Sequence, residues 1–237
     1  MSRRGLIADV HANLPALEAV LRRLRALDIA DLLVAGDLVG YGAQPNEVVE
    51  LLQDAGAVCV LGNHDLMALG VSNGPCSELC QRCMEYTRRV LSPATRDYLA
   101  ALPEEQIVDD VVVAHGGLGD PWRYVRNRAE AEVELQALRR RVPQARWLVL
   151  GHTHRRAVYG DESSHVVNPG SVGQSRGLLP VATFGVLDGG SCRLFSAAYD
   201  LRAARRSLRD ADLPWRAVHS PPRLGQAVRR RLKLRRG

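Results

Sequence analysis

The chain has 237 residues, of which 46% are hydrophobic and 24% charged, and its formal net charge is +6. This composition excludes a disordered protein, and no stretch approaches the roughly 18 uninterrupted apolar residues of a transmembrane helix. Two arginines but no apolar run precede Asp9. The start therefore predicts no signal peptide, no membrane partner and a cytoplasmic location.

Short apolar runs alternate with amphipathic stretches in the first part of the chain. Strands are predicted at residues 6–8, 32–35 and 57–61, and a helix at 45–54. Another helix is predicted after Asn13, a typical N-cap residue that Pro15 follows in the first turn. This alternation of strands and helices favours parallel pairing in an α/β layer fold.

The pattern changes after residue 70. A helical excursion is predicted over about 70–103, with one helix near 77–91 and a second from 93 to about 102. A single strand at 107–114, a helix at 129–141 and a strand at 147–150 follow. Beyond residue 166, short apolar runs between Gly, Pro and Ser turns predict antiparallel strands, at 166–167, 182–187 and 192–198.

The positive charge is concentrated at the end of the chain. Residues 202–237 contain 12 arginines and lysines and two acids, a net charge of +10, so the other 201 residues carry −4. A solvated amphipathic helix is the favoured interpretation of this tail. A contact with nucleic acid or another anionic surface is the alternative.

An odd number of cysteines, five, argues against a disulfide framework in a chain with no predicted secretory signal. Cys76, Cys80 and Cys83 share one face of a predicted helix. Packing beneath the helical excursion is favoured for these three, and a metal or redox role is the alternative.

Five loops share one design, in which polar residues, usually beside glycine, follow an apolar strand. Because ligands bind beyond the carboxyl ends of the strands in an open α/β sheet, these loops should converge at one edge. Five of the seven histidines fall in them, which disfavours five unrelated turns. Carboxylate, imidazole and amide ligands suit Mn²⁺, Fe or Zn²⁺ better than Ca²⁺ or Mg²⁺. The loops are Asp9-Val10-His11, Gly36-Asp37, Gly62-Asn63-His64-Asp65, His115-Gly116-Gly117 and Gly151-His152-Thr153-His154.

These five blocks resemble, in order, the signature blocks of the calcineurin-like metallophosphoesterases, and among them the small bacterial and archaeal phosphodiesterases. Residues 115–124 and 168–176 resemble two further segments of that subgroup, and the resemblance spans residues 5–200. It implies a four-layer α/β/β/α sandwich of two mixed sheets, with a binuclear metal site at the strand ends.

The resemblance also implies roles for single residues. Asp37 would bridge two divalent ions, most simply Mn²⁺, with Fe, Zn, Ni and Mg as alternatives. His64 would be the catalytic residue beside the leaving oxygen, while a hydroxide that bridges the ions attacks phosphorus in line. The seven implied metal ligands are Asp9, His11, Asp37, Asn63, His115, His152 and His154.

The second block departs from that of the protein Ser/Thr phosphatases in the superfamily. Gly40 stands where those enzymes carry a second Asp, and Tyr41 stands where they carry a phosphate-binding Arg. A phosphoprotein phosphatase, or a dinucleoside tetraphosphate hydrolase of that type, is therefore disfavoured. The favoured function is a phosphodiesterase acting on small or nucleotide-like substrates.

The expected organisation is a metallophosphoesterase domain over 1–201 and a basic tail over 202–237 that is helical and packs on the domain. The partner is a small phosphoester, with the pocket shaped by residues 70–130, Arg155, Arg156 and residues 168–176. A nuclease or nucleic-acid-linked phosphatase that uses the tail, a metal-binding interaction scaffold, and a homo-oligomer stay open.

Overall fold

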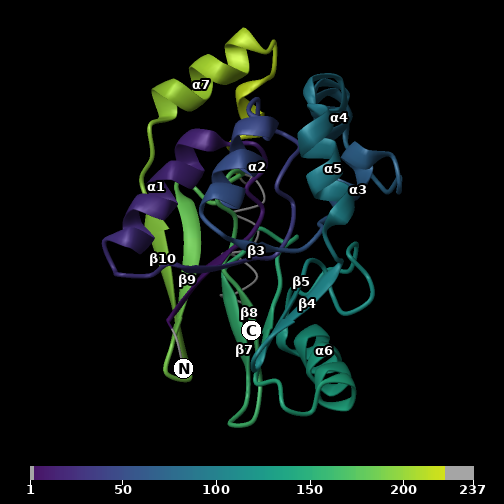
Figure 1. The fold of residues 1–237 in the computed structure, drawn as a ribbon, viewed down its shortest axis with the longest axis vertical. Helices are drawn as coiled ribbons and strands as arrows, with labels where there is room; N and C mark the ends of the chain where they lie inside the picture. Colours follow the sequence, from purple (N-terminus) through teal and green to yellow (C-terminus); the bar gives the residue numbers. More distant parts are fainter. Residues whose placement is uncertain (1–2, 222–237) are drawn as a thin grey trace, which may run out of the picture.

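Two five-stranded mixed sheets form the centre of the computed structural model, which describes residues 3–221 (Figure 1). The first sheet has the order β10-β9-β1-β2-β3 and the second the order β4-β5-β6-β8-β7. The strands of the first sheet are β1 Arg4–Ile7, β2 Asp31–Val34, β3 Val58–Cys59, β9 Ala182–Asp188 and β10 Ser191–Ala197. Those of the second are β4 Glu105–Val108, β5 Val111–Ala114, β6 Trp147–Val149, β7 Ala157–Gly160 and β8 His165–Asn168.

Helices cover the outer faces of both sheets. α1 (Leu14–Arg25) and α2 (Pro45–Asp54) pack on the first sheet, and α6 (Arg128–Arg141) packs on the second (Figure 1). α3 (Asn63–Leu69), α4 (Glu78–Val90) and α5 (Pro93–Ala101) form the helical excursion. In the described part of the chain, no helix has the length and apolar character needed to cross a membrane.

The alternation of side chains along the strands builds the layers. In β2, Leu33 packs between the two sheets, whereas Val34 packs under α1 and α2. In β6, Trp147 faces the other sheet and Leu148 faces α6. Each sheet is therefore buried on both faces, and the predicted four-layer α/β/β/α sandwich is confirmed.

The predicted helices are confirmed to within a few residues at their ends, because local capping signals mark them. Asn13 accepts a hydrogen bond from the Ala16 N–H at the start of α1. Ser77 and Ser92 cap α4 and α5 in the same way. Sequence reasoning overlooked α3, which is only seven residues long and begins within one of the predicted ligand loops.

Three strand predictions need correction. Residues 107–114 do not form one strand: β4 and β5 pair antiparallel around a turn at Asp109, whose φ of 53° is left-handed. Sequence reasoning joined the two apolar runs into one strand, although the adjacent Asp109 and Asp110 between them are typical turn residues. β8 was predicted to be an antiparallel strand, but it runs parallel to β6. β7, which was not predicted, pairs antiparallel with β8.

Sequence reasoning argued against a disulfide framework and favoured packing for Cys76 and Cys80, but these two cysteines form a disulfide. Cys76 and Cys80 are bonded, because Cys76 precedes the N-cap of α4 and Cys80 lies one turn into the helix, which brings their Cα atoms to 5.5 Å. Cys83 is a buried free thiol, as the packing interpretation expected. Within the described residues, the side-chain groups able to hold a metal contain no cysteine.

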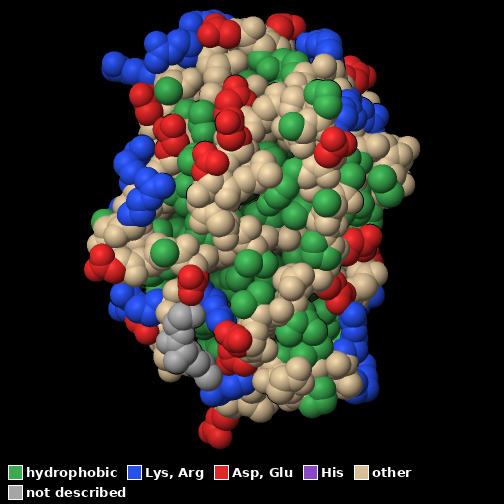
Figure 2. Space-filling view, in the orientation of Figure 1, with side chains coloured by type: hydrophobic (Ala, Val, Ile, Leu, Met, Phe, Trp, Pro, Cys, Tyr) green, Lys and Arg blue, Asp and Glu red, His purple; other side chains and the backbone are tan. Residues whose placement is uncertain are grey.

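The start of the basic tail forms α7 (Leu201–Asp210) and a short 3₁₀ helix, η1 (Trp215–Ala217). Ala204 and Leu208 are buried, and α7 lies against α1. The arginines of α7 lie on its exposed side, among the blue side chains along the top of Figure 2. The rest of the tail prediction falls on residues 222–237, outside the described residues.

Glu134 of α6 has a fully buried side chain that ties the helix to the loop after β5. Its carboxylate accepts hydrogen bonds from the Leu118 N–H at 2.8 Å and from Arg123 Nη1 at 2.8 Å.

We expect Glu134→Gln to lower the free energy of unfolding by about 1–3 kcal/mol, because one buried acceptor is lost. Urea denaturation measures this. Glu132→Gln, a half-exposed neighbour in α6, is the control, and an equal loss in both variants would contradict the assignment.

Candidate active site

The five predicted ligand loops meet at one end of the two sheets. β1, β2 and β3 run parallel in the first sheet, and β5 and β6 run parallel in the second. Hydrogen bonds join the loops to one another: the Asp9 N–H donates to the Gly36 carbonyl, and the Gly151 N–H donates to the His115 carbonyl. The strands therefore deliver the polar residues to a common centre, as expected from the strand-end pattern.

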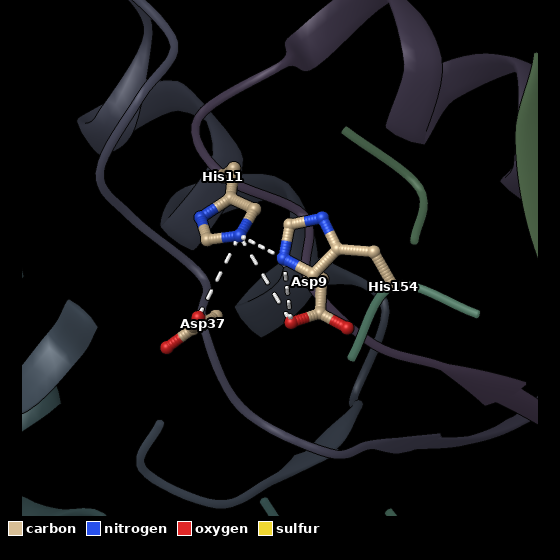
Figure 3. A group of neighbouring side chains, drawn as sticks. All are labelled: Asp9, His11, Asp37 and His154. Atoms are coloured by element: carbon tan, nitrogen blue, oxygen red, sulfur yellow. Dashed lines mark hydrogen bonds and ion pairs between the residues drawn. The ribbon is translucent and has the colours of Figure 1, made fainter. Parts of the chain in front are cut away.

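Two groups of side chains at this centre are able to hold a metal ion. In each group the potential ligand atoms lie within 4.8 Å of one another, and Asp37 belongs to both. The first group is Asp9, His11, Asp37 and His154, whose side chains point toward one another in Figure 3. The second group is Asp37, His115 and His152.

Asn63 lies beside the second group. Its Oδ1 is 3.0 Å from His115 Nε2, which is itself 3.3 Å from Asp37 Oδ2. Asn63 is the first residue of α3, so its side chain is placed by the start of that helix. All seven residues that sequence reasoning assigned as metal ligands are thus brought together.

Backbone carbonyls orient three of the histidines. The Nδ1 atoms of His11, His115 and His154 lie 3.2, 2.7 and 2.9 Å from the carbonyl oxygens of Val39, Ala35 and Gln174. In the neutral form of each ring, an N–H at Nδ1 leaves the lone pair on Nε2, which faces the centre. This is the usual way in which proteins orient histidine ligands.

The ligand loops adopt strained backbone conformations. Asp9, His11, Asp37, His152 and His154 all have φ between 49° and 65°, a left-handed region that costs of order 1–3 kcal/mol for a non-glycine residue. Gly36 has φ 75°, and a Cβ there would lie 2.7 Å from the Gly62 Cα atom. Such strain concentrates at functional sites, because packing elsewhere must offset it.

Burial and mutual charge perturb the titration of the cluster. Burial raises the pKa of Asp9 to about 8, and the nearby charge of Asp37 adds to that rise. Burial also acts to raise the pKa of Asp37, but the charges of His115 and His64 outweigh it and hold that pKa well below its usual value. Burial lowers the pKa of His11 and His154 well below 6.5. These two imidazoles are therefore neutral beside carboxylates.

The donor atoms of the cluster fit divalent cations. His11 Nε2 and His154 Nε2 lie only 3.2 Å apart, so two neutral imidazoles point their lone pairs at each other. Asp9 Oδ2 and His152 Nε2 are buried and have no hydrogen-bond partner among the described residues. Buried, unpaired donor atoms of this kind are costly unless they hold an ion.

His64 belongs to neither metal-binding group. Its ring packs against those of Tyr41 and His11, with centroids 4.7 and 4.8 Å away. Burial lowers its pKa, and its Nδ1 atom is buried with no hydrogen-bond partner in the described chain. His64 also lines the cavity that opens beside the metal ligands, so it is free to act on a molecule bound there.

Gly40 explains how His64 keeps its place. A Cβ at Gly40 would lie 2.6 Å from His64 Nδ1, so a side chain at position 40 would point at this imidazole. Glycine leaves room for the buried Nδ1 of His64, and the rings of Tyr41 and His11 pack against the imidazole.

We expect Gly40→Ala to lower kcat on an ester with a poor leaving group about a hundredfold by displacing His64, with the metal content unchanged. Steady-state kinetics and elemental analysis test this. Gly56→Ala is the matched control, because Gly56 has a similar left-handed φ of 62° but open space around it. Equal activity of the two variants would show that the position of His64 does not depend on Gly40.

Asp65 holds the second and third ligand loops together. Its carboxylate accepts hydrogen bonds from the Leu38, Val39 and Gly62 N–H groups at 2.9–3.2 Å. Sequence reasoning assigned no role to Asp65, which is the third residue of α3 and accepts the N–H of its N-cap, Gly62.

The cavity has a volume of about 220 Å³ and mixed walls. Trp122 and Tyr124, from the loop after β5, form an aromatic side, and Tyr124 lies against His152 with ring centroids 4.1 Å apart. Arg176 contributes a cation. Sequence reasoning expected the pocket within broad segments but did not single out these three residues, because they lie in loops without periodicity.

Comparison with known proteins supports the same fold and chemistry. The family model of the calcineurin-like phosphoesterase superfamily domain matches residues 3–190. Uncharacterized protein MJ0912 of Methanocaldococcus jannaschii is 29% identical over 234 residues, which cover 89% of this chain and 93% of that protein. A crystal structure of a metallophosphoesterase from Sphaerobacter thermophilus is 30% identical, with a TM-score of 0.75 over 91% of this chain and 97% of that one.

A third similarity covers only part of each protein. The symmetrical bis(5'-nucleosyl)-tetraphosphatase of Pseudomonas syringae pv. tomato is 29% identical over 142 residues, which are 55% of this chain and 46% of that enzyme. The matched part of the chain thus spans about half the length of that relative.

Proposed function

The chain belongs to the calcineurin-like phosphoesterase superfamily of metal-dependent phosphoester hydrolases, and from this we propose that it is a binuclear phosphodiesterase acting on small or nucleotide-like substrates. The observation that carries the proposal is that Asp37 belongs to both metal-binding groups. Because a carboxylate has two oxygens, Asp37 can coordinate a different ion with each of them.

The proposed first ion is held by Asp9, His11 and His154, and the second by Asn63, His115 and His152, with Asp37 between them. Such mixed ligand sets favour Mn²⁺, with Fe, Zn²⁺, Ni²⁺ and Mg²⁺ as alternatives. When bound, the two cations would stabilise charge on the phosphoryl oxygens and lower the pKa of an attacking water.

His64 would assist the departure of the leaving group. It lines the cavity and is not needed as a ligand. A neutral or protonated imidazole beside the departing oxygen can donate a hydrogen bond or a proton to it, which removes the need to expel a bare alkoxide.

Arg176 would bind the phosphoryl oxygens that face away from the ions. Among the described residues lining the cavity it is the only arginine or lysine. Its Nη2 lies 3.4 Å from His154 Nε2, and its other side-chain contact is with Gln174 Oε1, also at 3.4 Å. Within the described chain, no carboxylate lies within ion-pair distance of it. A guanidinium so placed suits a phosphate.

Arg176→Gln is expected to lower kcat/KM about a hundredfold, because a charge-assisted contact with the phosphate is lost. The metal content should not change, since Arg176 is not a ligand. Arg193→Gln, an exposed arginine of β10 far along the first sheet, serves as the control. Unchanged kcat/KM of the Arg176 variant would refute this role.

The size and walls of the cavity favour a small substrate. A volume of about 220 Å³ with Trp122 and Tyr124 on one side suits an aryl or nucleobase group stacked beside the phosphate.

A panel of phosphate mono- and diesters tests the proposed function. Metal-free protein is supplied in turn with Mn²⁺, Fe²⁺, Zn²⁺, Ni²⁺ and Mg²⁺, and the products are identified. We expect hydrolysis of diesters such as bis-p-nitrophenyl phosphate and of nucleotide esters, with lower kcat/KM for monoesters. Failure to hydrolyse any ester with any of these metals would overturn the proposal, and a preference for monoesters would overturn its diesterase part.

A further inference from the structure

A second hollow adjoins the catalytic cavity and carries three arginines. It has a volume of about 260 Å³ and is lined by Tyr124, Arg126, Thr153, Arg155 and Arg176. Tyr124 and Arg176 line both this hollow and the catalytic cavity. We propose that this hollow binds a second phosphate group of the substrate, an inference that rests on the proposed diesterase function.

The residues that line the hollow are mostly cationic. Its five lining residues include three arginines and no acid. Among the described residues Arg126 makes no ion pair, and its guanidinium lies over the ring of Tyr124, 4.3 Å from the centroid. Arg176 also makes no ion pair among the described residues, and its side-chain contacts are with neutral groups. The positive charges of Arg126 and Arg176 on a concave surface therefore attract an anion.

The elements that present these arginines are fixed close to the metal ligands. Arg155 follows His154 directly, and its N–H donates to Thr153 Oγ1. Arg126 belongs to the loop after β5, where the Tyr159 hydroxyl donates to its carbonyl oxygen. Ser175 and Gly177, on either side of Arg176, are hydrogen-bonded to Val218, Ser220 and His219 of the C-terminal segment. The arginines therefore surround a hollow of defined position.

The chemistry of the hollow favours phosphate over other anions. Arginine binds phosphate oxygens through pairs of parallel N–H groups, and several arginines suit a group that carries close to two negative charges. A volume of 260 Å³ accommodates one phosphate with its hydration but no long strand of nucleic acid, which needs an extended groove.

A third hollow, on the other side of Arg176, differs in character. It is larger, about 590 Å³, and its lining combines Arg155, Arg156 and Arg176 with the apolar side chains of Leu178, Leu179 and Val181. The apolar side chains suit an uncharged part of a substrate, whereas arginines make up three of the five residues that line the smaller hollow.

The test compares esters that differ by one phosphate. The p-nitrophenyl ester of thymidine 5′-phosphate is measured against the same ester with an added 3′-phosphate, and against the p-nitrophenyl ester of thymidine 5′-diphosphate. With Mn²⁺ in equal excess, we expect at least one phosphorylated ester to show about tenfold or greater kcat/KM. Calorimetric binding of thymidine 3′,5′-bisphosphate and thymidine 5′-phosphate gives a second readout that needs no turnover.

Variants locate the effect. The double variant Arg126→Gln/Arg155→Gln should lose the preference for the phosphorylated ester. Arg128→Gln, an exposed arginine at the start of α6, should keep it. Arg156→Gln distinguishes the hollows, because Arg156 lines only the larger one.

Three results would overturn the proposal: no preference for either phosphorylated ester or for the bisphosphate, a preference that survives in the double variant, or a preference lost in Arg156→Gln alone. Each leaves hydrolysis of the plain ester intact. If instead neither the plain nor the phosphorylated esters are hydrolysed with any metal, the proposed function itself has failed.

Discussion

Replacing Asp37 with asparagine is expected to release both metal ions and to lower kcat/KM by about a thousandfold or more. The change removes a charge and little else. Asparagine has nearly the same volume, tolerates the left-handed φ of 55° that Asp37 adopts, and can still accept the His64 N–H bond that Asp37 Oδ1 receives at 2.8 Å. Loss of metal would therefore report on ligation and not on misfolding.

Elemental analysis and thermal unfolding with and without Mn²⁺ measure this effect. The wild-type protein should be stabilised by added metal, because an ion that binds only the folded state raises its stability, and the Asp37→Asn variant should not. Asp54→Asn, an exposed carboxylate at the end of α2, is the control and should keep its metal. An Asp37→Asn protein with two ions per chain would refute the bridging assignment.

The second large effect is expected at His64. His64→Ala should keep both ions but lose about 10²- to 10⁴-fold in kcat on esters with a poor leaving group, such as a methyl ester of thymidine 5′-phosphate. On a p-nitrophenyl ester the loss should be small, because p-nitrophenolate departs without a proton.

The dependence on leaving group separates acid catalysis from a structural role. If His64 had only a structural role, its replacement would lower kcat on both esters alike. His165→Ala is the control, since His165 lies on β8 and stacks on Trp147 outside the cluster. Full activity of His64→Ala on the methyl ester would refute the role, and an equal loss on both esters would reassign His64 to positioning.

The layers of the fold could be predicted because burial and periodicity are local signals. Leu33 and Val34 alternate between two interfaces, and Asn13, Ser77 and Ser92 mark the starts of helices. The ligand loops followed from the same signals, since each comes directly after a buried strand.

The remaining features depend on contacts between distant segments. The turn between β4 and β5 is an exception, because Asp109-Asp110 between two apolar runs is a local turn signal that sequence reasoning overlooked. Tyr124 and Arg176 lie in two segments that were expected to shape the pocket, but nothing near either residue in the sequence shows that its own side chain faces the cavity. The bond between Cys76 and Cys80 depends on how the chain enters α4.

Gly40 and Tyr41, where the chain differs from the protein Ser/Thr phosphatases, both lie against His64 in the structure. Tyr41 packs its ring on His64 and His11, and Arg176 brings the cavity a positive charge from a different loop. The proposed phosphate contact thus comes from the segment after β8, in place of the second ligand loop.

A titration of metal-free protein with Mn²⁺, in which bound metal and hydrolysis of bis-p-nitrophenyl phosphate are measured on the same samples, tests the two-metal mechanism most directly. We expect activity to appear only as the second ion per chain binds, and to disappear when a chelator removes it. Turnover that is complete with one ion, or that persists after all metal is removed, would contradict the mechanism.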